Sequence, residues 1–98
     1  MINILVIGRH RDILEIIIRL LKSQPDWNAV GAQTDDEAIR CFAEQPFDLV
    51  LIGGGVDETA ETKLTTEFKN KKASVKIIRH YGGGSGLLYA EVKEALNI

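Results

Sequence analysis

The segment that decides the fold is Asp48-Leu49-Val50-Leu51-Ile52-Gly53-Gly54-Gly55, an apolar run that ends in glycines. Apolar residues in unbroken succession are typical of a strand that is covered on both faces, as in a parallel sheet. Glycines directly after a strand let the backbone turn sharply and approach other segments closely. We therefore predict a buried strand over residues 48–52, with its carboxyl end opening onto a crevice.

Short apolar runs of the same kind alternate with longer segments in which apolar residues recur at helical spacing. This alternation predicts strands over residues 4–7, 27–33, 48–52 and 75–78 and helices over residues 12–22, 35–45, 57–71 and 86–96. Helices that join consecutive short strands require right-handed crossovers and a parallel sheet with helices on both faces. We expect an α/β three-layer fold that forms a single domain over residues 1–98.

Polar residues ahead of the apolar stripes mark where the helices begin. Asp12, Thr34 and Ser85 are the predicted N-caps, and Thr34 with Glu37 fits a capping box. The residues predicted to face the sheet are Ile13, Leu14, Ile17, Leu20 and Leu21 in the first helix, Ala38, Ile39, Phe42 and Ala43 in the second, Leu64 and Phe68 in the third and Leu88, Val92 and Leu96 in the last.

Three stretches of the chain resemble the receiver domains of response regulators, the CheY-like, flavodoxin-like domains of two-component signalling. The stretches are Ile4–Ile7 with the following Asp12-Ile13-Leu14, Thr34 to Ile39, and Pro46 to Ile52. The resemblance covers about residues 3–80. It implies a four-stranded sheet in the order 2-1-3-4, with the family's fifth strand missing. The chain is thus similar to a degenerate and shortened receiver.

The residues that carry receiver chemistry are absent from this resemblance. Receivers place two acidic residues after the first strand to hold magnesium, and these positions are Gly8 and Arg9 here. They place the phosphoacceptor aspartate at Gly53 and a serine or threonine at Arg79. Magnesium requires a cluster of oxygen ligands, and glycine has no nucleophilic oxygen. We therefore predict a non-catalytic pseudo-receiver that is not phosphorylated on aspartate and serves as a signalling or scaffold module.

An alternative is a binding site for a small anion or a nucleotide phosphate at the same crevice. Ligands of doubly wound sheets bind outside the carboxyl ends of the strands, where backbone amides and arginines favour anions. The candidate residues are Arg9, His10, Gly53, Gly54, Arg79, His80, Gly83, Gly84 and Ser85. The loop over residues 82–86 is neither a Walker A motif nor a dinucleotide fingerprint. A glycine-rich turn between strand and helix is the favoured explanation of this loop, since glycine clusters usually mark turns.

Self-association is a further expectation, because a chain of this length builds only a modest core. Without a fifth strand the fourth strand is an edge, and apolar edges invite pairing. We expect a homodimer that uses this edge and the last helix, which the glycine-rich loop also allows to swap between protomers. The candidate contacts are Val75, Ile77, Leu87, Leu88, Tyr89 and Val92. A signalling protein of unknown identity is the other expected partner.

Composition narrows the remaining functions. A net charge of -2 gives no indication of nucleic acid binding, and no apolar run approaches the roughly 18 residues of a membrane span. Cys41 is the only cysteine, so we expect a reducing, cytoplasmic location. His10 and His80 are the only candidate acid–base groups and have no nucleophile at a useful spacing. We therefore expect no enzymatic activity, no cofactor and no metal site.

Overall fold

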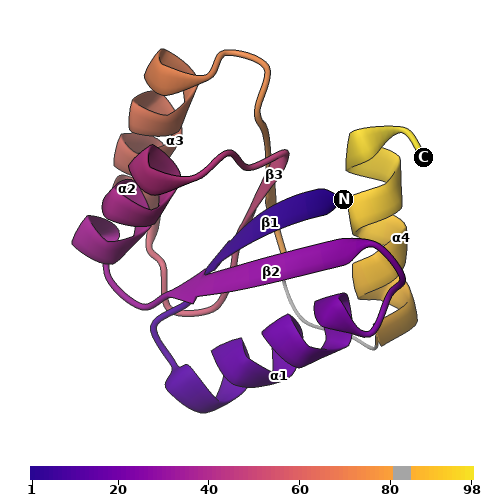
Figure 1. Ribbon diagram of the computed structural model, residues 1–98. Helices are drawn as coiled ribbons and strands as arrows, with labels where there is room; N and C mark the ends of the chain where they lie inside the picture. Colours follow the sequence, from indigo (N-terminus) through magenta and orange to yellow (C-terminus); the bar gives the residue numbers. More distant parts are fainter. Residues whose placement is uncertain (81–84) are drawn as a thin grey trace.

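A computed structural model describes residues 1–80 and 85–98 as a parallel sheet covered by helices on both faces (Figure 1). The elements are β1 (Ile2–Ile7), α1 (Arg11–Lys22), β2 (Trp27–Ala32), α2 (Asp35–Glu44), β3 (Leu49–Ile52), α3 (Glu58–Lys71), β4 (Lys76–Arg79) and α4 (Ser85–Leu96). The described part of the sheet has four strands in the order β2-β1-β3-β4. The predicted α/β flavodoxin-like fold and its strand order are confirmed.

Two hydrophobic clusters, one on each face of the sheet, hold the layers together. Side chains of α2 and α3, including Phe42, Leu64 and Phe68, pack against one face. Side chains of α1 and α4, including Leu21 and Leu88, pack against the other. Successive residues of a strand point to opposite faces, so a strand covered on both sides is apolar at every position. Each fully buried aliphatic side chain stabilises the fold by about 1.5–3 kcal/mol.

The starts of α2 and α1 confirm one predicted cap and correct another. The Thr34 hydroxyl accepts a hydrogen bond from the Glu37 amide at 3.1 Å, as the capping box predicts. The residue that caps α1 is His10, whose side chain makes no capping bond. The prediction of Asp12 as the N-cap is therefore wrong: it lies within the first turn of α1, where its charge favours the helix dipole.

Other boundaries differ from the predictions by about one residue, with consequences for two of them. β4 starts at Lys76, so Val75 lies just before the strand, where it is fully buried. α4 begins at Ser85. This residue is therefore the first of the helix, and the prediction that it precedes the helix as the N-cap is corrected. The structure does not describe the side chain of Ser85.

Two residues predicted to face the sheet face solvent. Ile13 is 52% exposed because the buried stripe of α1 consists of Leu14, Ile17 and Leu21. Ala43 is exposed, whereas Ala38 on the same helix is fully buried against the sheet. Helical spacing alone does not decide whether a residue at the edge of an apolar stripe faces the sheet or the solvent. Packing of the helix against the sheet decides it.

The two alanines of α2 give a matched test of this packing. We expect Ala38→Leu to lower the free energy of unfolding by about 1–3 kcal/mol, because the added atoms overfill a packed interface. Ala43→Leu makes the same change on the exposed side and should stay within about 0.5 kcal/mol of the parent protein. Urea denaturation of both variants measures the difference. Equal changes in the free energy of unfolding would contradict the observation that Ala38 faces the sheet and Ala43 faces solvent.

Candidate functional site

The carboxyl ends of the central strands meet at one corner of the sheet, as the topology predicts. The Gly53 amide donates to the Ile7 carbonyl at 2.7 Å, and the Arg9 amide donates to the Gly54 carbonyl at 3.1 Å. The His80 amide donates to the Ile52 carbonyl at 2.9 Å and aligns the end of β4 with them. The corner thus gathers the predicted residues Arg9, His10, Gly53, Gly54, Arg79 and His80. Gly83 and Gly84 lie outside the described residues.

The three glycines that follow β3 have different structural roles. A Cβ at Gly53 would lie 3.1 Å from the Ile7 carbonyl oxygen, a tight but not impossible contact. Gly54 is exposed, and a Cβ there would have no other atom within 4 Å. Gly55 has φ +83 and would place a Cβ 2.7 Å from the Arg9 Cβ. Of the three glycines, Gly55 is the one that the local backbone requires.

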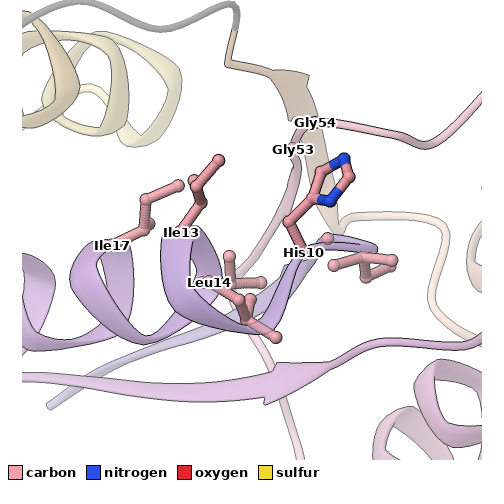
Figure 2. Close-up of a pocket in the computed structure, with 9 residues that line it drawn as sticks. His10, Ile13, Leu14, Ile17, Gly53 and Gly54 are labelled. Carbon is pink, nitrogen blue, oxygen red and sulfur yellow. The ribbon is translucent and has the colours of Figure 1, made fainter.

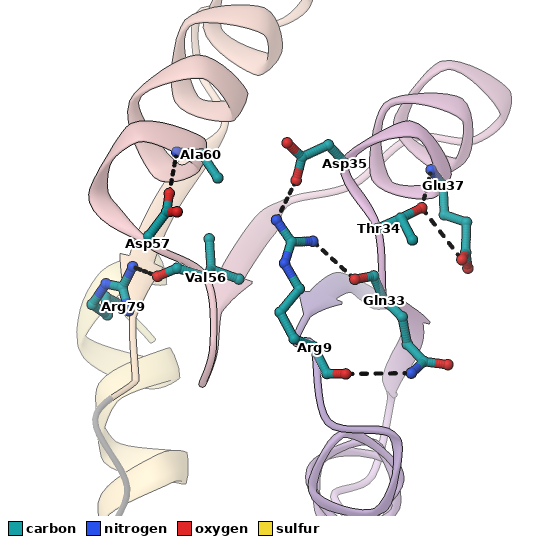
Figure 3. A network of polar contacts seen from close by, with 9 residues as sticks. All are labelled: Arg9, Gln33, Thr34, Asp35, Glu37, Val56, Asp57, Ala60 and Arg79. Carbon is teal, nitrogen blue, oxygen red and sulfur yellow. Dashed lines mark hydrogen bonds and ion pairs between the residues drawn. The ribbon is translucent and has the colours of Figure 1, made fainter.

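Arg9 is held by groups at the end of β2 and the start of α2 (Figure 3). Its Nη1 donates to the Gln33 carbonyl at 2.8 Å, and its Nη2 forms an ion pair with Asp35. The Gln33 side-chain amide donates back to the Arg9 carbonyl at 3.5 Å. Arg9 therefore joins three elements of the fold and carries a charge that an internal carboxylate already balances.

Arg79 and His80 are engaged in the same manner at the end of β4. Arg79 Nε forms an ion pair with Glu61 of α3 at 2.5 Å. Its Nη2 donates to the Val56 carbonyl at 2.6 Å (Figure 3). His80 is buried, and its Nδ1 lies 2.6 Å from Glu91 Oε1 of α4. The side chains of Arg9, Arg79 and His80, which the anion-site prediction invoked, thus each contact a carboxylate. This arrangement removes much of the positive charge on which that prediction depended.

Sequence reasoning missed the three carboxylates Asp35, Glu61 and Glu91. The three carboxylates lie on three different helices. In the sequence they are 26, 18 and 11 residues away from Arg9, Arg79 and His80, the strand-end residues that they contact. No local pattern identifies such pairs. The topology offers one signal, since all three lie in elements that begin at the carboxyl edge of the sheet or pack beside it.

A small apolar cavity lies between the ends of β1 and β3 and the first turns of α1 (Figure 2). It is lined by Val6, Ile7, Gly8, His10, Ile13, Leu14, Ile17, Gly53 and Gly54. Its volume of about 10 Å³ is close to that needed for one water molecule. Among residues 1–80 and 85–98, this cavity is therefore largely filled by the isoleucines and leucine of α1, and it has no room for a nucleotide.

The other reactive groups do not converge on this corner. Among residues 1–80 and 85–98, no three His, Cys, Asp or Glu side chains lie close enough to share a metal ion. Burial raises the pKa of the Cys41 thiol, and the nearby Glu44 carboxylate raises it further. This thiol on α2 is a weaker nucleophile than a free cysteine at neutral pH. In the described part of the chain, no helix is both long and apolar enough to cross a membrane.

Three of the predicted dimer contacts belong to the interior of the protomer. Val75 and Val92 are fully buried and Leu88 is 2% exposed, so these side chains are not available for surface contacts on the protomer as it is folded here. Leu88 and Val92 fill the core because α4 packs directly on one sheet face, and Val75 belongs to the cluster beneath α2 and α3 on the other face. Tyr89 is half-buried, and its hydroxyl donates to the Leu20 carbonyl at 3.0 Å. Ile77 is half-buried, and Leu87 is 53% exposed.

No family model matches the chain, and no curated protein matches its sequence. Solved structures match its fold. TrrA, a response regulator from Thermotoga maritima solved with Mg²⁺–BeF, aligns with a TM-score of 0.82 over 98% of this chain and 100% of its own, at 22% identity. The fold is the receiver fold. A LuxR-family DNA-binding response regulator from Silicibacter pomeroyi aligns with a TM-score of 0.79 over 99% and 92% of the two chains, at 16% identity.

The likeness extends to a receiver solved with a signalling partner. The complex of CheY6 with the phosphorylated P1 domain of CheA3, from R. sphaeroides, aligns with a TM-score of 0.69 at 17% identity. This match covers 99% of the present chain and 98% of the other. At such identities the comparison concerns the receiver fold alone. Within that fold, the ends of the first, third and fourth strands of this chain carry Gly8 with Arg9, Gly53 and Arg79.

Adjacent glycines provide a test of the backbone geometry of this corner. We expect Gly55→Ala to lower the free energy of unfolding by about 1–3 kcal/mol, since an alanine there adopts a strained conformation and overlaps Arg9. Gly54→Ala adds the same methyl group in open space and should change stability by at most about 0.5 kcal/mol. Thermal unfolding of the pair measures the difference, and a more harmful Gly54→Ala would contradict the described backbone.

Proposed function

We propose that the chain is a non-catalytic pseudo-receiver, a protein interaction module of a signalling system that is not phosphorylated on aspartate. The observation that carries this proposal is the strand-end corner, where β3 delivers Gly53 instead of a carboxylate. A phosphoacceptor must supply a nucleophilic oxygen, and the glycine supplies only backbone. The protein then functions through its surfaces.

The surroundings of Gly53 support the same conclusion. A receiver holds magnesium beside its phosphoacceptor through oxygen ligands, and the equivalent place here lies beside Gly8 and Arg9. A guanidinium repels a divalent cation, and Asp35, the carboxylate nearest to Arg9, is engaged with it in an ion pair. Neither the nucleophile nor the metal cluster of aspartyl phosphorylation is therefore available at this corner.

The likeness to receivers supports a signalling protein as the partner. CheY6 has the same fold and is bound to a phosphorylated P1 domain in its structure. The described residues of the present chain form a sheet of four strands with four helices on its outer faces, as in part of that fold. Together with the single cysteine, these features support a role in the reducing environment of the cytoplasm.

Self-association is the second part of the proposal. Large apolar side chains are exposed on the two helices of one face: Ile13 and Ile16 of α1 are 52% and 46% exposed, and Leu87 of α4 is 53% exposed. Exposed apolar groups of this size favour contact with another protein surface. We propose that a homodimer buries Leu87 together with apolar residues of α1. In this dimer the last helix, α4, takes part in the interface, as predicted from the sequence.

Exposure to a phosphodonor tests the first part of the proposal. After incubation with acetyl phosphate and magnesium, we expect the intact mass of the protein to remain unchanged, because Gly53 cannot form an acyl phosphate. A receiver that carries aspartate at this position serves as the positive control. A gain of one phosphoryl group that hydroxylamine removes would contradict the proposal. Heat released on titration with inorganic phosphate, lost in Arg79→Gln, would favour the anion-binding alternative.

Light scattering at micromolar concentrations tests self-association. We expect the mass of a dimer for the parent chain and a shift toward the monomer in Leu87→Ser and Ile13→Ser, since each removes exposed apolar area. Ile98→Ser is the matched control, because Ile98 is 63% exposed and lies at the C-terminus, beyond α4. A parent chain that is monomeric, or equal effects of all three substitutions, would count against this interface.

A further inference from the structure

A groove of about 420 Å³ lies along the outer side of β4. One wall is formed by Glu61, Thr65 and Lys69, which recur every four residues and therefore share one side of α3. The floor is β4 itself, and Ala95 of α4 lines the groove opposite α3. Because β4 is the last strand in the order β2-β1-β3-β4, the groove follows an edge of the described sheet.

The backbone of this edge offers hydrogen bonds to an additional strand. The amides of Lys76 and His80 donate inward, to the Asp48 and Ile52 carbonyls at 3.2 and 2.9 Å. Backbone groups of alternate residues point to opposite sides of a strand, so the N–H and C=O of Ile77 point away from β3. Among residues 1–80 and 85–98, neither group has a hydrogen-bond partner.

The groove is basic at the end where β4 begins. Lys69 Nζ donates to the Val75 carbonyl at 2.5 Å, which fixes this ammonium beside Lys76. Neither lysine forms an ion pair with a described carboxylate, and residues 81–84 contain no acidic side chain. At the other end of the groove Arg79 is balanced by Glu61. The uncompensated charge of the groove is therefore positive and lies at one end.

We propose that this groove binds an extended acidic segment of a partner protein, which adds to β4 as a further strand. The Ile77 backbone groups supply main-chain hydrogen bonds, Ile77 and Ile78 supply apolar contact, and a carboxylate of the partner lies near Lys69 and Lys76. A second copy fits less well, because antiparallel pairing of two β4 edges about Ile77 brings two Lys76 side chains near each other. This inference rests on the proposed role as an interaction module.

Two synthetic peptides test the charge of the partner. Both consist of alternating valine and threonine, and one ends in two glutamates while the other ends in two lysines. We expect the glutamate peptide to bind more tightly, with an affinity that falls as salt is added. In amide NMR spectra its binding should shift Ile77 and Lys76. Equal affinity of the two peptides, or no binding at millimolar concentration, would overturn the proposal.

A charge reversal in the groove has a matched control outside it. Lys76→Glu should weaken the glutamate peptide by about three- to tenfold and favour the lysine peptide instead. Lys71→Glu makes the same change in net charge on an exposed residue that lines a different surface, between α2 and α3, and should leave both affinities unchanged. Equal effects of the two substitutions would show that peptide binding depends only on the net charge of the protein. This result would overturn the proposed binding site in the groove.

A backbone substitution tests strand addition itself. Ile77→Pro removes the outward N–H without removing an inward bond to β3 and should abolish peptide binding, whereas Ile77→Ala should retain it. Circular dichroism confirms that both variants are folded. If Ile77→Pro or Lys76→Glu changes the oligomeric state, the occupant is a second copy and the proposal is wrong. If the protein is an unphosphorylated dimer that binds neither peptide, the groove is not a binding site for an acidic strand. The proposed function as an interaction module would not be affected by that result.

Discussion

The burial of β3 and of the last four residues of β1 is the constraint on which the rest of the structure depends. Ile4 to Ile7 of β1 and Leu49 to Ile52 of β3 are 0% exposed. A polar side chain at any of these positions would need an internal partner to offset the loss of water. Functional groups are therefore confined to the strand ends, the helix surfaces and the outer strands. This is why the candidate residues gather at one corner even though they come from distant parts of the chain.

At that corner, charged side chains join elements of the fold. Arg9 with Asp35 connects the end of β1 to α2, Arg79 with Glu61 connects β4 to α3, and His80 with Glu91 connects β4 to α4. These pairs are partly buried, so the removal of one member would leave the other without its compensating charge. At the corner where a receiver carries out its chemistry, these pairs form contacts between helices and strands.

The sequence predicts the fold in some detail because its strongest signals are local. Unbroken apolar runs identify the strands, and the alternation of strands and helices fixes the parallel topology. The Thr34 cap is also predictable, since its partner lies three residues away. The errors concern choices that tertiary packing makes: Ile13 and Ala43 lie at the margins of apolar stripes, and Val75, just before β4, is fully buried in the core.

The candidate site is less predictable, because its character depends on pairs that the sequence separates widely. Arg9 and Arg79 suggest a basic corner until Asp35 and Glu61 are placed beside them. Gly53 and Gly55 look alike in the sequence, yet only Gly55 has a positive φ. Burial in the core likewise decides that Leu88 and Val92 are internal, which helical spacing alone leaves open.

Lys76 also protects the protein against aggregation. β4 is a four-residue strand at the edge of the sheet, and its two central residues are isoleucines. Edges of this composition promote uncontrolled sheet extension in crowded solutions unless charge or brevity prevents it. The exposed ammonium at the start of the strand brings like charges together when two such edges stack, which is unfavourable. The charge that would select an acidic partner in the proposed groove is therefore also the charge that opposes the stacking of identical edges.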